Sequence, residues 1–587
     1  MDMQISLLLD AYRRGALSPT QMVDIVLERV RRYPDQGIWI TAPEAGKLRR
    51  QAAALEARGM EGLPLYGIPF AIKDNIDLQD VPTTCACPAF AFSPSRSAVV
   101  VQKLIDAGAI PLGKTNLDQF ATGLNGTRSP YGPCLNAFDP AYIAGGSSSG
   151  SAVAVALGLA SFALGTDTAG SGRVPAAFNN IIGLKPSCGR LSSAGVFPAC
   201  RSLDTVSIFA LSALDAERVL GVCEGVDSAD PYTRAYAQDH GLPEDFRFGV
   251  PPAAARAFFG NTEAADLFDA AVGRLTALGG KAVEIDFSPF LEAARLLYEG
   301  PWVAERYLAI REFIDAQPEA MDATVRQIVL QGKRYAAAEA FAAQHRLQAL
   351  RRQAEATFAA IDVLVTPTAP TIYSIAEMQE NPVALNANLG YYTNFMNLLD
   401  MSAVAVPGGF QRNGLPAGIT LCAPSGSDRA LLALTQRFQR ASALPLGATD
   451  EVLSAEVFPA LPSGRVKIAV VGAHLSGLPL NHQLIERDGR RIAVTRTAPS
   501  YRLYALADGK RPGLVRSEEG AAIEVEVWEL AVAHYGSFVA AIAPPLGIGP
   551  VLLENGECVQ GFLCEAYSAT GLQDITHYGG WRAYVSR

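Results

Sequence analysis

Residues 145–151 read GGSSSGS, and residues 165–173 read GTDTAGSGR. These runs place two serines, Ser147 and Ser171, on neighbouring glycine-rich loops. An earlier apolar run, GIPFAIKDN, carries Lys73 near its end. A serine nucleophile, a second serine and a lysine can form a proton-transfer chain that needs no histidine. The three side chains are therefore candidate catalytic groups.

A tract of glycine and serine is usually a flexible linker. Here the apolar run 152–157, AVAVAL, follows at once and predicts a buried helix, and residues 161–165 predict a short strand. A disordered linker would not lead into such sequence. The tract is therefore interpreted as a loop inside a folded domain.

Two other motif interpretations are disfavoured. Residues 146–150, GSSSG, fit the nucleophile elbow of α/β-hydrolases with Ser148 as nucleophile, but that elbow needs a strand directly before it. Residues 136–141, NAFDPA, are rich in turn formers instead. A phosphate-binding loop is excluded because no Gly-Lys-Ser/Thr closes the glycine run. Of six histidines only His240 and His345 lie before residue 446, in no recognisable motif, which disfavours a Ser-His-Asp enzyme.

Length and composition limit the remaining possibilities. A chain of 587 residues is expected to form two or more domains. The formal net charge of −9, without a basic cluster, argues against nucleic-acid and anionic-membrane partners. The N-terminus lacks the features of a secretion signal, and the apolar stretch 152–164 is too short to span a membrane. The nine cysteines show no metal-like spacing, so we expect reduced thiols, a cytoplasmic protein and no metal or cofactor.

The pattern along the chain predicts an α/β domain followed by a smaller unit. Residues 65–200 alternate apolar strands, glycine-rich loops and helices, and residues 262–360 have helical composition. Residues 361–367 predict a buried strand. Such alternation is typical of layered α/β domains with a mixed, mostly parallel sheet. A capping box at 18–21 predicts the start of a helix.

The pattern changes after residue 446. We predict a first domain over 1–446, a linker over 447–464 and a β-rich α+β domain over 465–587. In the last of these, residues 466–472 predict a strand, and residues 523–528 alternate strictly between apolar and polar side chains.

The motifs at 67–75, 145–151, 165–171 and 183–186 resemble the amidase signature family, whose fold has a mixed central sheet flanked by helices. The resemblance implies a Ser-cisSer-Lys triad in which Ser171 is the nucleophile, Ser147 the bridging serine and Lys73 the terminal base. Lys73 must be neutral to accept a proton, and burial lowers the pKa of a lysine.

The same resemblance implies an oxyanion hole beside the nucleophile, formed by the backbone N–H groups of Thr168, Ala169, Gly170 and Ser171. Small residues in this run permit close approach of the backbone to a substrate. Asp167 and Arg173 are expected to form an internal ion pair that shapes the loop.

Within the family, the loop 120–132, which contains Gly123, is similar to that of allophanate hydrolases, as are segments of the second unit: 479–482, 498–504 and 579–584. The likeness implies that Gly123 helps bind substrate and that Tyr298 and Arg306 hold its carboxylate. Without it, Arg306 would be interpreted as part of a solvated helix face. Pro301 lies between Tyr298 and Arg306, so helical spacing does not establish a shared face.

The second unit is similar to gamma-glutamyl cyclotransferase-like folds, although no acidic catalytic residue is identified in it. In allophanate hydrolases this domain is associated with decarboxylation of the first product, and His482 is the candidate residue; a buried structural histidine is the alternative.

Together these resemblances predict hydrolysis of allophanate to ammonia and carbon dioxide through an acyl-enzyme and N-carboxycarbamate. They also predict a homodimer coupled to a biotin-dependent urea carboxylase, although a triazine-ring pathway could supply the same substrate. Two alternatives stay open. One is another small-amide amidase, such as the amidase component of an amidotransferase that feeds ammonia to a charged tRNA. The other is a non-catalytic binding subunit of a urea-degrading assembly.

Overall fold

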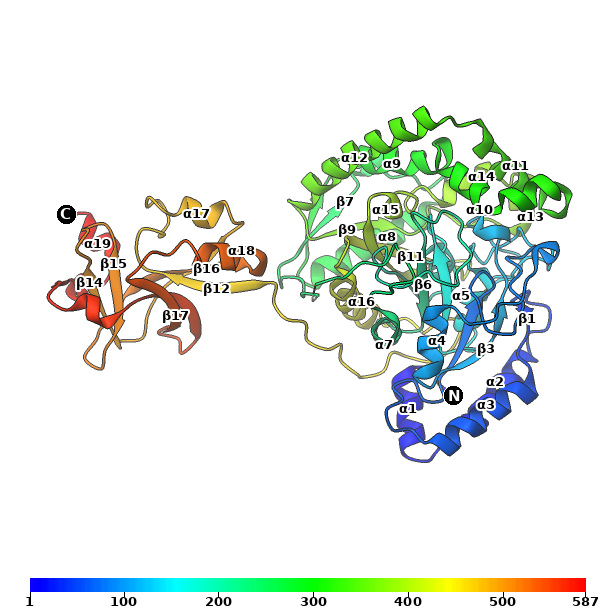
Figure 1. The fold of residues 1–587 in the computed structure, drawn as a ribbon, viewed down its shortest axis with the longest axis horizontal. Helices are drawn as coiled ribbons and strands as arrows, with labels where there is room; N and C mark the ends of the chain where they lie inside the picture. The colour runs from blue at the N-terminus through cyan, green and yellow to red at the C-terminus, as the bar shows by residue number, and fades with distance from the viewer. Residues whose placement is uncertain (238) are drawn as a thin grey trace. The chain divides into compact units, whose positions relative to one another are not determined.

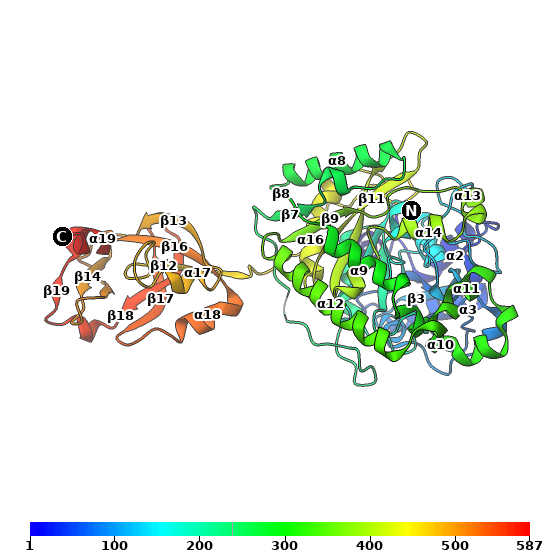
Figure 2. The same cartoon turned by 90° about the horizontal axis from the view of Figure 1, so that it is seen from above.

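A computed structural model describes residues 1–237 and 239–587, which form two compact units, Met1–Leu461 and Pro462–Arg587 (Figures 1 and 2). The division falls inside the segment predicted as a linker. Most of that segment lies against the first unit, because the side chains of Leu453 and Phe458 pack on its core. Gln4 also donates a 2.9 Å hydrogen bond to the carbonyl of Val452.

The first unit is built on one eleven-stranded sheet with the order β1-β3-β2-β4-β6-β5-β10-β11-β9-β7-β8. Its strands are β1 Trp39–Thr41, β2 Pro69–Lys73, β3 Ile110–Thr115, β4 Phe162–Asp167, β5 Ile182–Lys185, β6 Thr205–Ala210, β7 Arg247–Val250, β8 Lys281–Glu284, β9 Val363–Pro367, β10 Met401–Phe410 and β11 Pro416–Pro424.

The sheet is mixed, as predicted, but it is not mostly parallel. Among the described residues the pairs β2–β3, β2–β4, β7–β9 and β7–β8 are parallel, and the other neighbouring pairs are antiparallel. The prediction missed the hairpin at the centre of the sheet, where five residues join β10 to β11. So short a connection can join only antiparallel strands.

Helices cover both faces of this sheet: α1 Ile5–Arg13, α2 Pro19–Val30, α3 Ala45–Arg58, α4 Val99–Asp106, α5 Ser149–Ala156, α6 Val174–Phe178, α7 Ala213–Cys223, α8 Thr262–Ala277, α9 Ser288–Glu299, α10 Trp302–Ala316, α11 Ala323–Leu330, α12 Ala337–Phe358, α13 Ile375–Glu380, α14 Ala384–Leu389, α15 Phe395–Leu398 and α16 Asp428–Ser442. The capping box predicted at Ser18 is present at the start of α2. The helical region predicted at 262–360 is confirmed as α8 to α12, except that β8 interrupts it.

Alternate residues of the sheet supply two separate cores. Val363 and Val365 of β9 pack with α8 and α16, whereas Leu364 packs with α9, α12 and α15 on the opposite face (Figures 1 and 2). This is the two-residue period expected of a strand buried on both faces. The strand predicted at 361–367 is therefore confirmed.

The second unit is β-rich, as predicted. It has a five-stranded sheet of order β13-β16-β12-β18-β17 and a three-stranded sheet of order β15-β14-β19. The elements are β12 Arg465–Val470, α17 His482–Ile485, β13 Arg490–Arg496, β14 Tyr501–Ala505, β15 Pro512–Arg516, β16 Glu524–Ala531, α18 Val532–Val539, β17 Leu546–Leu552, β18 Cys558–Cys564, β19 Gln573–Asp574 and α19 Trp581–Val585. The strands predicted near 466–472 and 523–528 are β12 and β16.

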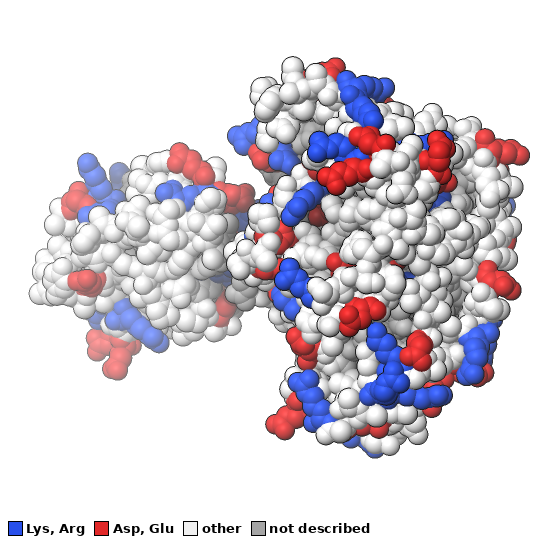
Figure 3. Space-filling model, turned by 45° about the vertical axis from the view of Figure 1, so that its right-hand side comes forward, with Lys and Arg blue, Asp and Glu red and all other residues white. Residues whose placement is uncertain are grey.

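Charged side chains of both signs are interspersed over the face shown in Figure 3, rather than gathered by sign. Within the described ranges, no helix combines the length and apolar character needed to cross a lipid bilayer.

Candidate active site

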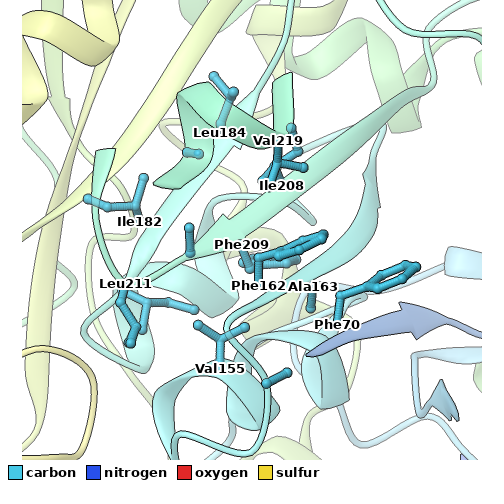
Figure 4. Close-up of a cluster of buried hydrophobic side chains, with 14 of the residues drawn as sticks. Phe70, Val155, Phe162, Ala163, Ile182, Leu184, Ile208, Phe209, Leu211 and Val219 are labelled. Atoms are coloured by element: carbon cyan, nitrogen blue, oxygen red, sulfur yellow. The ribbon is translucent and has the colours of Figure 1, made fainter. Parts of the chain in front are cut away.

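The candidate site lies where two parallel strands end. β2 ends at Lys73 and β4 ends at Asp167, and their pairing aligns Ile72 with Leu164. Below these ends the side chains of Phe70 and Phe162 stack with ring centroids 5.1 Å apart, within the buried cluster drawn in Figure 4. A tightly packed core therefore fixes the two strand ends side by side.

Lys73 and Ser147 are in direct contact. The Lys73 Nζ donates hydrogen bonds to Ser147 Oγ at 2.8 Å and to Thr166 Oγ1 at 2.7 Å, and the lysine is 0% exposed. Burial lowers the pKa of the Lys73 ammonium to about 7, against the opposing effect of the Asp118 and Asp204 carboxylates. A large fraction of this amine is therefore neutral near pH 7, as a general base requires.

Ser171 lies on the loop that follows β4 and is buried. Its hydroxyl donates a long hydrogen bond of 3.5 Å to the carbonyl of Gly123. The peptide Gly146–Ser147 is cis. In the described part of the chain no direct hydrogen bond joins Ser147 to Ser171. The structure thus unites Lys73 with Ser147, and Ser171 with Gly123.

The loop containing Gly123 is held by Asp118, a buried residue that sequence reasoning missed. Its carboxylate accepts hydrogen bonds from the backbone N–H groups of Asn125 at 3.2 Å, Gly126 at 3.0 Å and Arg128 at 3.0 Å. A Cβ atom at Gly123 would lie 2.5 Å from Asp118 Oδ2, so only glycine fits this loop position. No local motif marks an aspartate of this kind.

Four consecutive N–H groups, those of residues 168–171, have no hydrogen-bond acceptor within the described residues, although all four residues are buried. Gly170 has φ +150° and packs against Thr393, whose Oγ1 would lie 2.4 Å from an added Cβ. Buried N–H groups are rarely left without a partner. This loop is therefore suited to bind an oxyanion beside Ser171.

Asp167 and Arg173 form the ion pair expected from the sequence. Arg173 Nη2 lies 2.9 Å from Asp167 Oδ1, and neither side chain is exposed. Burial alone would raise the pKa of Asp167, but the guanidinium overcomes this effect and keeps that pKa below its usual value. Asp167 Oδ2 also accepts a 2.9 Å hydrogen bond from the Gly172 N–H, so the pair fixes the loop that carries Ser171.

Tyr298 and Arg306 lie on different helices, since Pro301 separates α9 from α10. Their side chains nevertheless meet: Arg306 Nη2 lies 3.4 Å from the Tyr298 hydroxyl, and the guanidinium lies 5.5 Å from the centre of the tyrosine ring. Arg306 is 3% exposed, so the solvated-face interpretation is wrong.

The Arg306 guanidinium has no carboxylate partner within salt-bridge distance among the described residues. Its Nη1 donates to the Ala121 carbonyl at 3.3 Å and to Thr122 Oγ1 at 3.1 Å. Its buried Nε has no hydrogen-bond partner among the described residues. A buried, unpaired cation is costly unless an anion binds it. The site is therefore suited to an anionic ligand.

Tyr298, the contact partner of Arg306, lines a cavity of about 470 Å³. Asn386 also lines this cavity, and its Oδ1 accepts a 2.8 Å hydrogen bond from the Leu124 N–H beside Gly123. Asn394, another lining residue, has a buried Oδ1 for which the described part of the chain supplies no hydrogen-bond donor. Neither asparagine stands in a motif that sequence reasoning could use.

In the second unit, His482 is exposed, so it is not the buried structural histidine considered as an alternative. Its Nδ1 lies 2.8 Å from the Pro479 carbonyl. Sequence reasoning also missed Glu526, which is 2% exposed and accepts hydrogen bonds from Ser476 Oγ at 2.8 Å and Arg582 Nη2 at 2.7 Å.

No group of three or more histidine, cysteine or acidic side chains that could hold a metal ion occurs in the described ranges. The nine cysteines are free thiols, and Cys85 and Cys87 are both buried.

Comparison with known proteins covers both units. The family model described as Amidase matches residues 23–432, and that described as Allophanate hydrolase C-terminal domain matches residues 466–586. The urea amidolyase of Saccharomyces cerevisiae is 44% identical over 588 residues, covering 96% of this chain and 32% of that protein. This chain thus spans about a third of that relative's length.

Two further comparisons add to this result. The solved structure of selenomethionine-substituted Kluyveromyces lactis allophanate hydrolase is similar with a TM-score of 0.78 and 41% identity over 99% of both chains. The A subunit of the glutamyl-tRNA(Gln) amidotransferase from Chlorobaculum tepidum is 31% identical, over 72% of this chain and 95% of its own.

Proposed function

The chain belongs to the amidase family and carries the C-terminal domain of allophanate hydrolases, and from this we propose that it hydrolyses allophanate, urea-1-carboxylate, to ammonia and carbon dioxide. One observation carries the proposal. Ala121 and Thr122 accept hydrogen bonds from the buried Arg306, and the next residue, Gly123, accepts the hydrogen bond from Ser171. An anion pocket therefore adjoins the nucleophile, as a small anionic amide requires.

In the proposed first step, neutral Lys73 takes a proton from Ser147, which takes one from Ser171. The Ser171 oxygen attacks the terminal amide carbonyl, and the N–H groups of residues 168–171 bind the oxyanion that forms. The proton returns through Ser147 to the leaving nitrogen, which departs as ammonia. The approach of Ser147 to Ser171 is expected to tighten in the substrate complex.

Water then attacks the acyl-enzyme and releases N-carboxycarbamate, while Ser171 recovers its proton through the same relay. Tyr298 and Arg306 hold the substrate carboxylate throughout by charge-assisted hydrogen bonds. N-carboxycarbamate takes up a proton and loses carbon dioxide. The remaining carbamate takes up a second proton from water and decomposes to carbon dioxide and the second ammonia. Every step uses side chains and water alone.

We assign the decarboxylation to the second unit, with His482 as its candidate residue. The imidazole is exposed, and its Nε2 makes no hydrogen bond to another described residue, so a small anion can reach it. We further propose that the protein is a cytoplasmic homodimer. We also propose that it is coupled to a biotin-dependent urea carboxylase, because the long relatives are named urea amidolyases. A triazine-ring pathway is the other class of source for the substrate.

The alternatives are less well supported. The related amidotransferase component matches only 72% of this chain. An amidotransferase function would therefore leave the domain at residues 466–586 unexplained. A non-catalytic binding protein would not need the buried contact between Lys73 and Ser147.

The test is release of ammonia from allophanate and, in parallel, from a neutral amide such as propionamide. We expect allophanate to be turned over with far higher kcat/KM. Equal turnover of both amides, or turnover of neither, would contradict the assignment.

A further inference from the structure

A short turn, Ala199–Asp204, braces the helix that carries Arg306. The Cys200 thiol donates to the Trp302 carbonyl at 3.4 Å, and the Ser202 N–H donates to Glu305 Oε2 at 3.0 Å. Trp302 and Glu305 belong to the first turns of α10, directly before Arg306. The turn is therefore attached to the side of the proposed carboxylate pocket.

The other end of the same turn holds the proposed oxyanion loop. Thr168 Oγ1 donates a hydrogen bond to Asp204 Oδ1. The Asp204 carboxylate also accepts from the N–H groups of Ala199 at 2.7 Å and Cys200 at 3.1 Å. One carboxylate thus joins Thr168, the first residue of the loop, to the turn that contacts α10.

The charge on Asp204 acts on the substrate pocket as well. Burial raises the pKa of Asp204 to about 6, opposed by the Thr168 hydrogen bond and by the charge of Arg306. Asp204 is therefore mostly ionised at neutral pH. Within the described residues no lysine or arginine lies in salt-bridge contact with it, so its charge acts on Arg306 from a distance.

We propose that Asp204 is a positioning residue for the reaction. It fixes Thr168 to the turn that contacts α10. The distance between the oxyanion loop and Arg306 is thereby held constant. Its negative charge also moderates the attraction of Arg306 for an anionic substrate. The inference rests on the proposed function, in which residues 168–171 bind the oxyanion and Arg306 binds the carboxylate.

The test uses a matched pair at Thr168. Thr168→Val keeps the shape of the side chain but removes the donor, and Thr168→Ser keeps the donor. We expect Thr168→Val to lower kcat for allophanate by about 10- to 100-fold, with KM changed less than about threefold, because the lost hydrogen bond is charge-assisted. Thr168→Ser should stay within about threefold of the wild-type kcat.

Asp204→Asn distinguishes the effect of the hydrogen bond to Thr168 on kcat from the effect of the negative charge near Arg306 on KM. It should lower kcat to a similar degree while it lowers KM for allophanate by about two- to fivefold, because a negative charge near Arg306 is removed. KM for propionamide should not change. The double variant Thr168→Val/Asp204→Asn should lose no more kcat than the worse single variant, as expected of two groups in one interaction.

Wild-type kcat in folded Thr168→Val, equal losses in both Thr168 variants, or additive losses in the double variant would each overturn the inference. If Asp204→Asn fails to fold, as judged by circular dichroism, the Thr168 pair still decides. Ser171→Ala, assayed beside these proteins, reports on the proposed function separately. Full turnover by Ser171→Ala would mean that the proposed function itself is wrong.

Discussion

Lys73 Nζ lies 2.8 Å from Ser147 Oγ, and both side chains are fully buried. The described residues place no carboxylate in salt-bridge contact with this lysine. Its other hydrogen-bond acceptor is a neutral hydroxyl, that of Thr166. A lysine in such surroundings is prepared to exchange a proton with a serine rather than to carry a permanent charge.

The first prediction concerns the nucleophile. Ser171→Ala should lower kcat for allophanate by about 10⁴-fold or more, because no acyl-enzyme can form. Ser148→Ala is the matched control, since Ser148 is the nucleophile of the rejected elbow interpretation and its hydroxyl forms hydrogen bonds with the Thr166 backbone. We expect Ser148→Ala to lose less than about tenfold. The reverse ranking would transfer the nucleophile to Ser148.

The second prediction is a pH dependence. Because the free amine is the active form and the pKa of Lys73 is about 7, kcat/KM should rise with pH through about 7 and then level off. Lys73→Met should remove this rise together with most of the rate. A pH–rate profile that keeps the same rise in Lys73→Met would show that another group titrates there.

Lys73→Met should gain thermal stability although it loses activity. The folded-state pKa of Lys73 lies below the unfolded value of 10.5, so unfolding takes up a proton between these two pH values. The burial of Lys73 therefore costs most below about pH 7, and the cost fades as the pH rises toward 10.5. Thermal denaturation at pH 7 should show Lys73→Met to be more stable than the wild type. Equal or lower stability would argue against a depressed lysine pKa.

The third prediction concerns substrate specificity. Arg306→Ala should lower kcat/KM for allophanate by at least about 10- to 100-fold, because a desolvated charge-assisted contact is lost. Turnover of propionamide should fall much less. Arg311→Ala is the control, since this arginine lies on the same helix but is exposed. Parallel losses on both amides in Arg306→Ala would make Arg306 a structural residue.

The fourth prediction concerns the second unit. A protein of residues 1–461 should fold and release the first ammonia at the wild-type rate, whereas N-carboxycarbamate should accumulate. A shorter protein of residues 1–446 should instead expose part of the hydrophobic core, because it lacks Leu453 and Phe458, which pack on the first unit. The measurement is a time course of products by carbon NMR.

His482→Ala in the full chain should delay carbon dioxide release in the same way if that imidazole acts on the intermediate. His534→Ala, another exposed histidine of the second unit, should behave as the wild type. Identical time courses for the full chain, the 1–461 protein and His482→Ala would leave the second unit a structural role.

The sequence identified those parts of the site that short motifs encode. The glycine- and serine-rich runs indicated Ser147 and Ser171, and the apolar run 67–75 indicated Lys73 near its end. The helix and strand predicted after the serine run are α5 and β4. Local spacing, capping and hydrophobic period carry this information.

Other parts of the site depend on contacts between distant segments. Asp204 is an ordinary aspartate in the sequence, and only the fold brings it to Thr168. Asp118 lies near the Gly123 loop in sequence, but no motif marks its carboxylate as the acceptor for that loop. The burial of Arg306 likewise results from the packing of α10 against residues 121–122. The usual exposure of arginines would have placed this residue on a solvated face.

Because the Arg306 guanidinium has no carboxylate partner among the described residues, it should also lower the stability of the protein when no anion is bound. A ligand that binds only the folded protein raises the melting temperature by mass action, and here it would relieve an uncompensated charge as well. Malonamate, in which CH₂ replaces the central N–H of allophanate, should therefore raise the melting temperature of the Ser171→Ala protein. Propionamide should not, and Arg306→Ala should abolish the response. The residue proposed to select the substrate would thus also make protein lifetime depend on substrate supply.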